Sequence, residues 1–377
     1  MKKVVIVYSK SGGGHLTLGK DAKEALETYY PGEFDVSFFD PLPSISTYLY
    51  GKLGSDWPGL WGLLYHSTNK TLLAKVINLL GSTSITNRIL KYLEKVKPDV
   101  IIINHAATTF GVEKAVRKLG IKPKIVVEFA DPFSVHKLWY AYKNANLYLA
   151  LVEETISDAV KNGIPKDKLV KTGYPASSRF DASRYSKATT REILNLKQDS
   201  FVLYVGGSGQ GGGSLLKLCK KLGENKTIKN RCQLVIVAGR NPSLVKKLVK
   251  LSAVDTTFFN VFAHANNVPQ LLSASDLIVG KAGPSFIFEA LFMGKPVFST
   301  ACLPGQEEGN LEFIQREDVG WVEKNLDKAV LQIERIVIDP KLIEEKLTNV
   351  TRVVKLHENS QKKFATEIAK LCGVESF

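Results

Sequence analysis

The sequence predicts an α/β protein of two domains, each with a parallel sheet covered by helices. The chain has 377 residues, a length that usually forms two domains. Short runs rich in Val and Ile alternate with helical patterns along the chain, as in sheets of the doubly wound, Rossmann-like class. Each half opens with such a run followed by glycines. We therefore expect two Rossmann-like domains that face a ligand-binding cleft.

Strands are predicted from apolar runs bounded by polar or turn residues. They cover residues 4–8, 34–40, 99–104, 124–130 and 146–151 in the first half, and 201–205, 233–239, 257–263, 276–280, 296–300 and 319–323 in the second. The segment 172–190 is polar with Gly, Pro and Ser, which is typical of a linker. The predicted domains are residues 1–175 and 176–350, and a helical tail, 351–377, could cross back to the first domain.

The charge favours an anionic partner, although a lysine-rich surface that only aids solubility would have the same composition. The chain has 51 Lys and Arg against 37 Asp and Glu, a net charge of +14, which favours nucleic acid, a phosphorylated ligand or an anionic membrane surface. The four cysteines have no C-x-x-C spacing, so neither a zinc site nor a disulfide framework is expected. No signal peptide and no membrane-spanning run are recognisable. We expect a cytoplasmic protein that is soluble or peripherally attached to a membrane.

An aromatic insert, residues 42–80, interrupts the first half. It carries Tyr48, Tyr50, Trp57, Trp61 and Tyr65 together with Lys52, Lys70 and Lys75. Aromatic rings and lysines suit a membrane interface, where rings sit at headgroup level. An ordinary helical hairpin packed on the sheet would have the same pattern, and both interpretations stay open.

The first glycine turn, residues 9–20, predicts an anion-binding turn that carries a histidine. It reads SKSGGGHLTLGK and fails the P-loop pattern, because Asp21 stands where a hydroxyl is needed, and the dinucleotide pattern, because Thr17 replaces a glycine. What remains is a turn whose N–H groups can face an anion, with His15 at the positive end of a helix. A histidine there tends to stay neutral and can accept a proton.

The second glycine turn, residues 206–214, contains G-x-G-x-x-G at Gly207, Gly209 and Gly212. A dinucleotide fold would place an acidic residue after the next strand to bind the ribose. Arg240 stands there instead, which argues against NAD and leaves NADP as an alternative.

Residues 277–310 predict a nucleotide-sugar site. A strand ends at Lys281, Gly283 permits a tight turn, and Pro284 suits the first helical position. Ser285 and Glu289 share one helix face. A carboxylate at this place can accept two ribose hydroxyls while helix N–H groups hold phosphate. The polar loop 305–310 has amides and carboxylates that suit the hydroxyls of a sugar.

These segments resemble glycosyltransferase family 28, and within it the monogalactosyldiacylglycerol synthases and processive diacylglycerol glucosyltransferases. The resemblance rests on GGGH at 12–15, GG at 206–207, AGRN at 238–241, SDLIVGKAGP at 275–284 and GQEEGN at 305–310. It implies a GT-B fold, a UDP-sugar donor, a lipid acceptor such as diacylglycerol, inversion at the anomeric carbon, no bound metal and no cofactor. The more distant relatives leave open a UDP-N-acetylglucosamine donor with a polyprenyl-linked acceptor.

The resemblance also implies residue roles. His15 and Asp131 are the catalytic candidates, with either as the base or Asp131 orienting His15. Gly13, Gly14 and His136 would line the acceptor side of the first, membrane-facing domain. The UDP-sugar residues would be Gly207, Ser208, Arg240, Phe262, Val268, Gly283, Pro284, Ser285, Glu289, Gln306, Glu307 and Asn310.

Two departures from the family put the substrate in question. Ser285-Phe286 replace the usual Gly-Thr, and Ala130-Asp131 replace Thr-Asp. Two other classes of protein fit the sequence less well: an NADP oxidoreductase, which leaves the polar loop 305–310 unexplained, and a nucleic-acid binder, for which no recognised module is found in the sequence. The expected partners are therefore a UDP-sugar, a lipid acceptor and an anionic membrane surface, with no nucleic acid.

Overall fold

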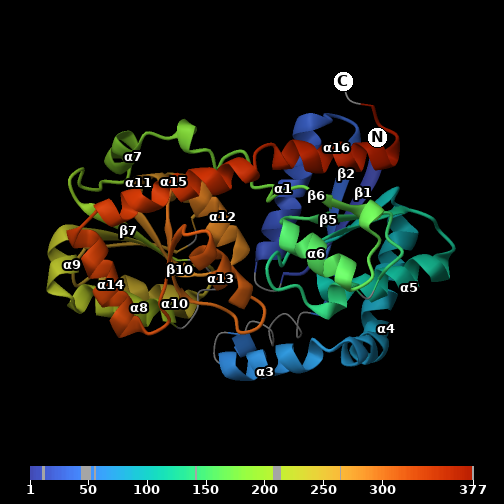
Figure 1. The fold of residues 1–377 in the computed structure, drawn as a ribbon, viewed down its shortest axis with the longest axis horizontal. Helices are drawn as coiled ribbons and strands as arrows, with labels where there is room; N and C mark the ends of the chain where they lie inside the picture. Colours follow the sequence, from blue (N-terminus) through green and yellow to red (C-terminus); the bar gives the residue numbers. More distant parts are fainter. Residues whose placement is uncertain are drawn as a thin grey trace. The chain divides into compact units, whose positions relative to one another are not determined.

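The computed structural model divides into two compact units, which are described separately. It describes residues 1–10, 13–43, 52–54, 57–140, 142–206, 214–263 and 265–375, with the backbone alone for 71–82. Unit 1 comprises Met1–Ser177, Leu303–Gln306 and His357–Phe377. Unit 2 comprises Ser178–Cys302 and Glu307–Leu356. Figure 1 shows that each unit is built from a sheet and the helices around it.

Unit 1 contains a parallel sheet with the strand order β2-β1-β3-β4-β5-β6. The strands are β1 (Lys2–Val7), β2 (Phe34–Phe39), β3 (Val100–Ile103), β4 (Lys124–Glu128), β5 (Leu147–Ala150) and β6 (Leu169–Lys171). The helices are α1 (Gly14–Tyr29), α3 (Pro58–Thr68), α4 (Thr71–Val96), α5 (Thr109–Leu119), α6 (Glu153–Lys161) and α16 (Ser360–Cys372).

The two faces of the unit 1 sheet are covered by different helices. Val4, Ile6 and Ile102 pack with residues of α1 and α16. Val5, Val7 and Ile101 pack on the opposite face with residues of α4, α5 and α6. A strand buried on both faces needs apolar residues at consecutive positions, which explains the runs VVIV and VIII in β1 and β3.

Unit 2 has a second parallel sheet, with the strand order β12-β11-β10-β7-β8-β9. The strands are β7 (Phe201–Gly206), β8 (Cys232–Val237), β9 (Phe259–Phe262), β10 (Leu277–Lys281), β11 (Val297–Ala301) and β12 (Gly320–Val322). The helices are α7 (Lys187–Ile193), α8 (Ser214–Glu224), α9 (Lys226–Arg231), α10 (Pro242–Ser252), α11 (Val268–Ala274), α12 (Pro284–Phe292), α13 (Glu308–Arg316), α14 (Leu326–Ile338) and α15 (Lys341–Leu356).

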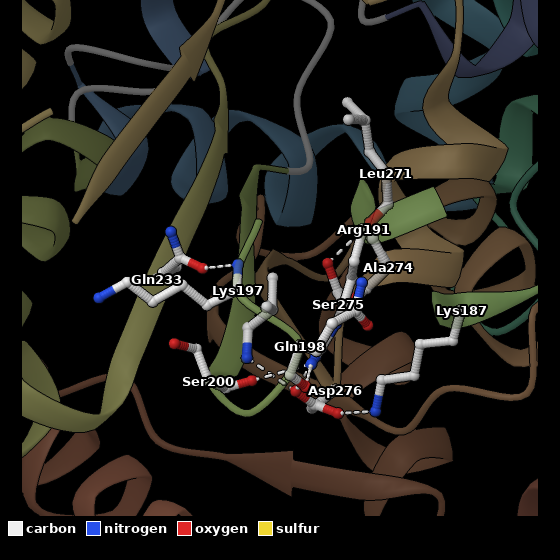
Figure 2. Close-up of polar contacts among 11 residues, drawn as sticks. Lys187, Arg191, Lys197, Gln198, Ser200, Gln233, Leu271, Ala274, Ser275 and Asp276 are labelled. Carbon is white, nitrogen blue, oxygen red and sulfur yellow. Dashed lines mark hydrogen bonds and ion pairs between the residues drawn. The ribbon is translucent and has the colours of Figure 1, made fainter. Parts of the chain in front are cut away.

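A buried arginine joins several segments at the start of the unit 2 sheet (Figure 2). Arg191 of α7 is 3% exposed, and its guanidinium donates to the main-chain oxygens of Ala274, Gln198 and Ser200. Its Nη2 also donates to Asp276 Oδ2 at 2.7 Å. The same carboxylate oxygen accepts from the N–H of Val202 at 2.7 Å. This side chain therefore ties α7 to the beginnings of β7 and β10.

The predicted strands are all present, with ends shifted by a few residues. The prediction missed β6, a three-residue strand at the sheet edge, because so short a run has no recognisable periodicity. It also treated residues 172–190 as linker throughout, whereas α7 begins at Lys187. Among the described helices, none combines the length and apolar character that crossing a membrane requires.

Candidate active site

The candidate residues of each unit lie where the strand order reverses. In unit 1, β1 and β3 are neighbours, and the chain continues from β1 to β2 on one side and from β3 to β4 on the other. In unit 2, β7 and β10 are neighbours, and the chain continues from them to β8 and to β11 in the same way. Ligands of open α/β sheets bind beyond the carboxyl ends of the strands at such points. His15 follows β1, and Gly283 follows β10.

His15 is held in one tautomer by the neighbouring strand. It is the second residue of α1, which begins after Gly13, a glycine with φ 84°, and it is 8% exposed. His15 Nδ1 lies 2.7 Å from the main-chain oxygen of Asn104. Because a carbonyl oxygen only accepts, the proton of the neutral ring must be on Nδ1. Nε2 is then the nitrogen that can take up a proton.

Asn104 and His105, which sequence reasoning missed, complete this site. Asn104 Nδ2 donates to the main-chain oxygen of His15 at 3.0 Å. The ring of His105 lies 4.6 Å from that of His15, and His105 Nδ1 accepts from the N–H of Ala107 at 3.3 Å. Burial, and then the neighbouring His15, lower the pKa of His105 well below its usual value. The available signal was a polar pair directly after a buried strand.

Asp131 binds other groups than His15. Its Oδ2 accepts from Trp139 Nε1 at 3.0 Å, and its Oδ1 accepts from Gln306 Nε2 at 3.1 Å. No hydrogen bond joins Asp131 to His15 within the described part of unit 1, so Asn104 is the observed orienting partner of His15. Gln306, expected among the sugar-binding residues, belongs to unit 1 with Asp131.

His136 has both ring nitrogens in structural contacts. Nδ1 accepts from the N–H of Leu138 at 3.1 Å, so Nε2 carries the proton and donates to Thr68 Oγ1 at 3.2 Å. The ring packs edge-on against Tyr65, 4.8 Å away. Burial lowers the pKa of His136 to about 4, against the opposing charge of Asp131. This neutral histidine fixes α3 to the segment after β4.

In unit 2, the predicted sugar and phosphate residues gather around the start of α12. Gly283 precedes the helix, and Pro284 and Ser285 are its first two residues. Lys281 Nζ and Glu307 Oε1 form an ion pair, and Asn310 Nδ2 donates to the main-chain oxygen of Ala282 at 2.7 Å. Asn310 Oδ1 is buried without a partner among the described residues. The N–H groups at the start of α12 and these side chains can bind an anion and hydroxyl groups.

Glu289 lies one turn into α12 and has an altered acidity. Burial raises the pKa of Glu289 to about 7, while the charge of Arg179 opposes the shift. Tyr204 of β7 is close enough for Glu289 to contribute to the raised pKa of its hydroxyl. A buried carboxylate of this kind gains by accepting hydroxyl hydrogen bonds.

The remaining donor candidates follow neighbouring strands of the same sheet. Arg240 is exposed after β8, Phe262 ends β9, and Val268 begins α11. The carboxyl ends of parallel strands lie at one sheet edge, so these residues share an edge with Gly283. Gly207 and Ser208 lie outside the described residues.

If Glu289 binds the ribose of a UDP-sugar, as the sequence predicts, the affinity for UDP-glucose should rise by up to about tenfold between about pH 6 and about pH 8 and level off above. Glu289 is largely protonated at the lower pH, whereas ribose hydroxyls bind best to its charged form, so binding releases a proton. UDP-glucose is suitable because its diphosphate does not titrate in this range. Calorimetry should show the dependence in the wild type and not in Glu289→Gln. If the affinity of the wild type for UDP-glucose does not change with pH, Glu289 does not bind the ribose.

Two family models match the sequence of the chain. The family model of monogalactosyldiacylglycerol (MGDG) synthase matches residues 39–176, and that of the glycosyltransferase family 28 C-terminal domain matches residues 201–371. The chain is 25% identical to monogalactosyldiacylglycerol synthase 1, chloroplastic, of Arabidopsis thaliana over 351 residues. This match covers 90% of the chain and 64% of the relative, less than two thirds of its length.

A bacterial relative is covered more completely. The processive diacylglycerol beta-glucosyltransferase of Bacillus cereus (strain ATCC 10987 / NRS 248) is 24% identical over 352 residues, which are 91% of the chain and 88% of the relative. Among solved structures, the S. aureus MnaA-UDP co-structure has a TM-score of 0.65 at 14% identity, covering 100% of this chain and 98% of that one. This likeness confirms the predicted two-domain α/β fold of the GT-B type. The two family models confirm the predicted resemblance: the chain combines an N-terminal region of the monogalactosyldiacylglycerol synthase type with a glycosyltransferase family 28 C-terminal domain.

Proposed function

We propose that the protein transfers a hexose from a UDP-sugar to the hydroxyl of a lipid such as diacylglycerol, with inversion and without a metal ion. The observation that carries this proposal is the bond from His15 Nδ1 to the oxygen of Asn104, since it leaves Nε2 as a proton acceptor at the switch point of unit 1. The names of the relatives, which act on diacylglycerol, support the acceptor class.

In this reaction His15 Nε2 removes the proton of the acceptor hydroxyl. The hydroxyl oxygen then attacks the anomeric carbon on the face opposite the phosphate, the glycosidic bond to UDP breaks, and the configuration inverts. The Nδ1–H bond to Asn104 stabilises the imidazolium that forms. Negative charge on the departing UDP would be balanced by the N–H groups of α12 and by Arg240.

The donor side of the proposal rests on unit 2. Glu289 would accept the ribose hydroxyls, Gly283, Pro284 and Ser285 would surround the diphosphate, and Glu307 and Asn310 would bind the sugar. The unpaired Asn310 Oδ1 supports this role, since a sugar hydroxyl can donate to it. UDP in the similar S. aureus structure supports the same nucleotide.

Helix α3 of the aromatic insert supports a lipid surface as the place where the protein acts. Four large apolar side chains at and in α3 face solvent: Trp57 62%, Leu60 38%, Leu63 67% and Leu64 42% exposed. Rings and leucines exposed together on a short helix suit the interface of a bilayer. The predicted peripheral membrane association of a cytoplasmic protein is therefore retained as a part of this proposal.

The test is transfer from labelled UDP-glucose or UDP-galactose to vesicles that contain diacylglycerol, in the presence of EDTA. We expect a glycolipid whose anomeric configuration is opposite to that of the donor. Trp57→Ser with Leu63→Ser should slow transfer to vesicles much more than to detergent-dispersed acceptor. Leu331→Ser, at a 56% exposed leucine of α14, is the control. A requirement for added Mg²⁺ or Mn²⁺, or a retained configuration, would contradict the proposal.

A further inference from the structure

Glu128 is a buried acid that the proposed mechanism does not use. It is the last residue of β4 and is 0% exposed. Neither of its carboxyl oxygens has a hydrogen-bond partner among the residues that the structure describes. Burial raises the pKa of Glu128 to about 8, so the group holds its proton at neutral pH. A buried polar group without a hydrogen-bond partner lowers the stability of the folded protein. The neighbours of Glu128 therefore need to be searched for a possible partner.

Asn104 is the polar residue that the pairing of β3 and β4 places next to Glu128. β3 and β4 are parallel, with Ile102 beside Val126 and Ile103 beside Val127. Asn104 directly follows β3 and Glu128 ends β4, so the same register continued by one residue places Asn104 beside Glu128. Ile102 and Val126 pack in the layer that contains α1 and α16 residues. Side chains two positions apart on a strand point to the same face. Asn104, directly after β3, and Glu128, at the end of β4, are therefore inferred to enter the same layer.

Asn104 also has an unused acceptor. Its Nδ2 donates to the main-chain oxygen of His15, and its own main-chain oxygen accepts from His15 Nδ1. Its Oδ1 is buried and has no partner in the described part of the chain. An ionised Glu128 would offer only acceptors to this oxygen, whereas a protonated carboxyl is a donor. A bond from a protonated Glu128 to Asn104 Oδ1 would pair both groups.

We propose, resting on the proposed function, that Glu128 is a positioning residue for the transfer: its acid proton bonds Asn104 Oδ1 and so holds the groups that orient His15. With Oδ1 occupied from the β4 side, Nδ2 is turned toward His15. Both hydrogen bonds between Asn104 and His15 then keep the ring in the Nδ1–H tautomer. Loss of the acid proton would place two acceptors together and a negative charge behind His15.

Few other ionisable groups face this layer. α1 contributes the buried His15 and Asp21, the chain after β1 contributes Tyr8, and His357 precedes α16. Tyr30, directly after α1, and the partly buried Cys372 of α16 also pack in this layer, and the described buried residues of α16 include no ionisable side chain. β5 contributes Leu147 and Leu149. Burial, and no neighbouring charge, is the cause of the raised pKa of Glu128, so its own proton is the one that titrates near pH 8.

The test compares two substitutions of the full chain. Glu128→Gln keeps a permanent donor and removes the titration, whereas Glu128→Leu removes the donor at similar size. Val126→Ala, on the same face of β4, is the control for a change of packing alone. Three readouts are measured for each variant: kcat and KM between about pH 6 and about pH 9, the tautomer of His15 by ¹⁵N NMR, and the thermal midpoint against pH.

We expect Glu128→Gln to keep wild-type turnover at pH 7, and Glu128→Leu to lose about tenfold or more in kcat with an unchanged KM for the UDP-sugar. Wild-type kcat should fall as pH rises through about 8, and that of Glu128→Gln should not. The folded pKa lies above the ordinary value of 4.5, so the wild type loses stability as pH rises from about 5 to about 8. Glu128→Gln should not show this loss.

The NMR and stability readouts need no activity, which separates this inference from the proposed function. The wild type could transfer no hexose while His15 loses the Nδ1–H tautomer in Glu128→Leu and in no other variant. This result would contradict the proposed function and support the positioning role of Glu128. If Glu128→Leu keeps both the tautomer and the wild-type kcat, or matches Val126→Ala in every readout, the positioning role is overturned.

Discussion

Replacing His15 with alanine is expected to lower turnover on a lipid acceptor by ~10²–10⁴-fold, the usual contribution of a general base. The loss should be in kcat, because His15 acts on the acceptor hydroxyl in the transition state. UDP affinity should hardly change, since the proposed donor residues belong to unit 2. Single-turnover kinetics together with UDP calorimetry would measure both quantities.

Asp131 provides the comparison for this experiment. Its carboxylate holds Trp139 and Gln306 instead of His15, so Asp131→Asn is expected to be milder than His15→Ala. The two effects should be close to additive, because no hydrogen bond couples the residues in the described structure. An active His15→Ala beside an inactive Asp131→Asn would identify Asp131 as the base and leave His15 as a polar residue of the turn.

Replacing Arg191 with methionine is expected to lower the free energy of unfolding of unit 2 by about 3–5 kcal/mol. The guanidinium is buried, and its removal leaves Asp276 and three main-chain oxygens without their donor. Methionine fills similar space, so the loss would come from the unpaired polar groups and not from a cavity. Urea unfolding followed by the fluorescence of Trp321, which belongs to unit 2, would measure it.

Lys187 is the matched control for Arg191. It pairs with the other oxygen of the same carboxylate, Asp276 Oδ1, but its side chain is 47% exposed. An exposed ion pair contributes about 0–1 kcal/mol, so Lys187→Met should shift the unfolding curve only slightly. Equal shifts for the two variants would show that charge near Asp276, and not the buried network of Figure 2, stabilises this end of the sheet.

Local sequence signals were sufficient for much of this protein. Runs such as VVIV and VIII must be strands buried on both faces, and they are β1 and β3. The start of α12 followed from Gly283 and Pro284, because proline suits the first helical turn. His15 was found by its place between a strand and a helix. Each of these features depends on neighbours within a few residues along the chain.

The partners of these residues were decided by the tertiary structure. His15 is oriented by Asn104, which lies 89 residues away in sequence, and no local pattern specifies which of many polar residues will meet it. β6 forms only because β5 offers an edge to pair with. In the sequence, Glu128 has no feature that distinguishes it from other glutamates at strand ends. Its pKa is raised only because helices cover both faces of the sheet and bury the carboxyl group. Local backbone preference and periodicity were enough to predict which segments form strands and glycine turns. The strand order decided which side chains meet and how they are protonated, because contact and burial are properties of the packed sheet.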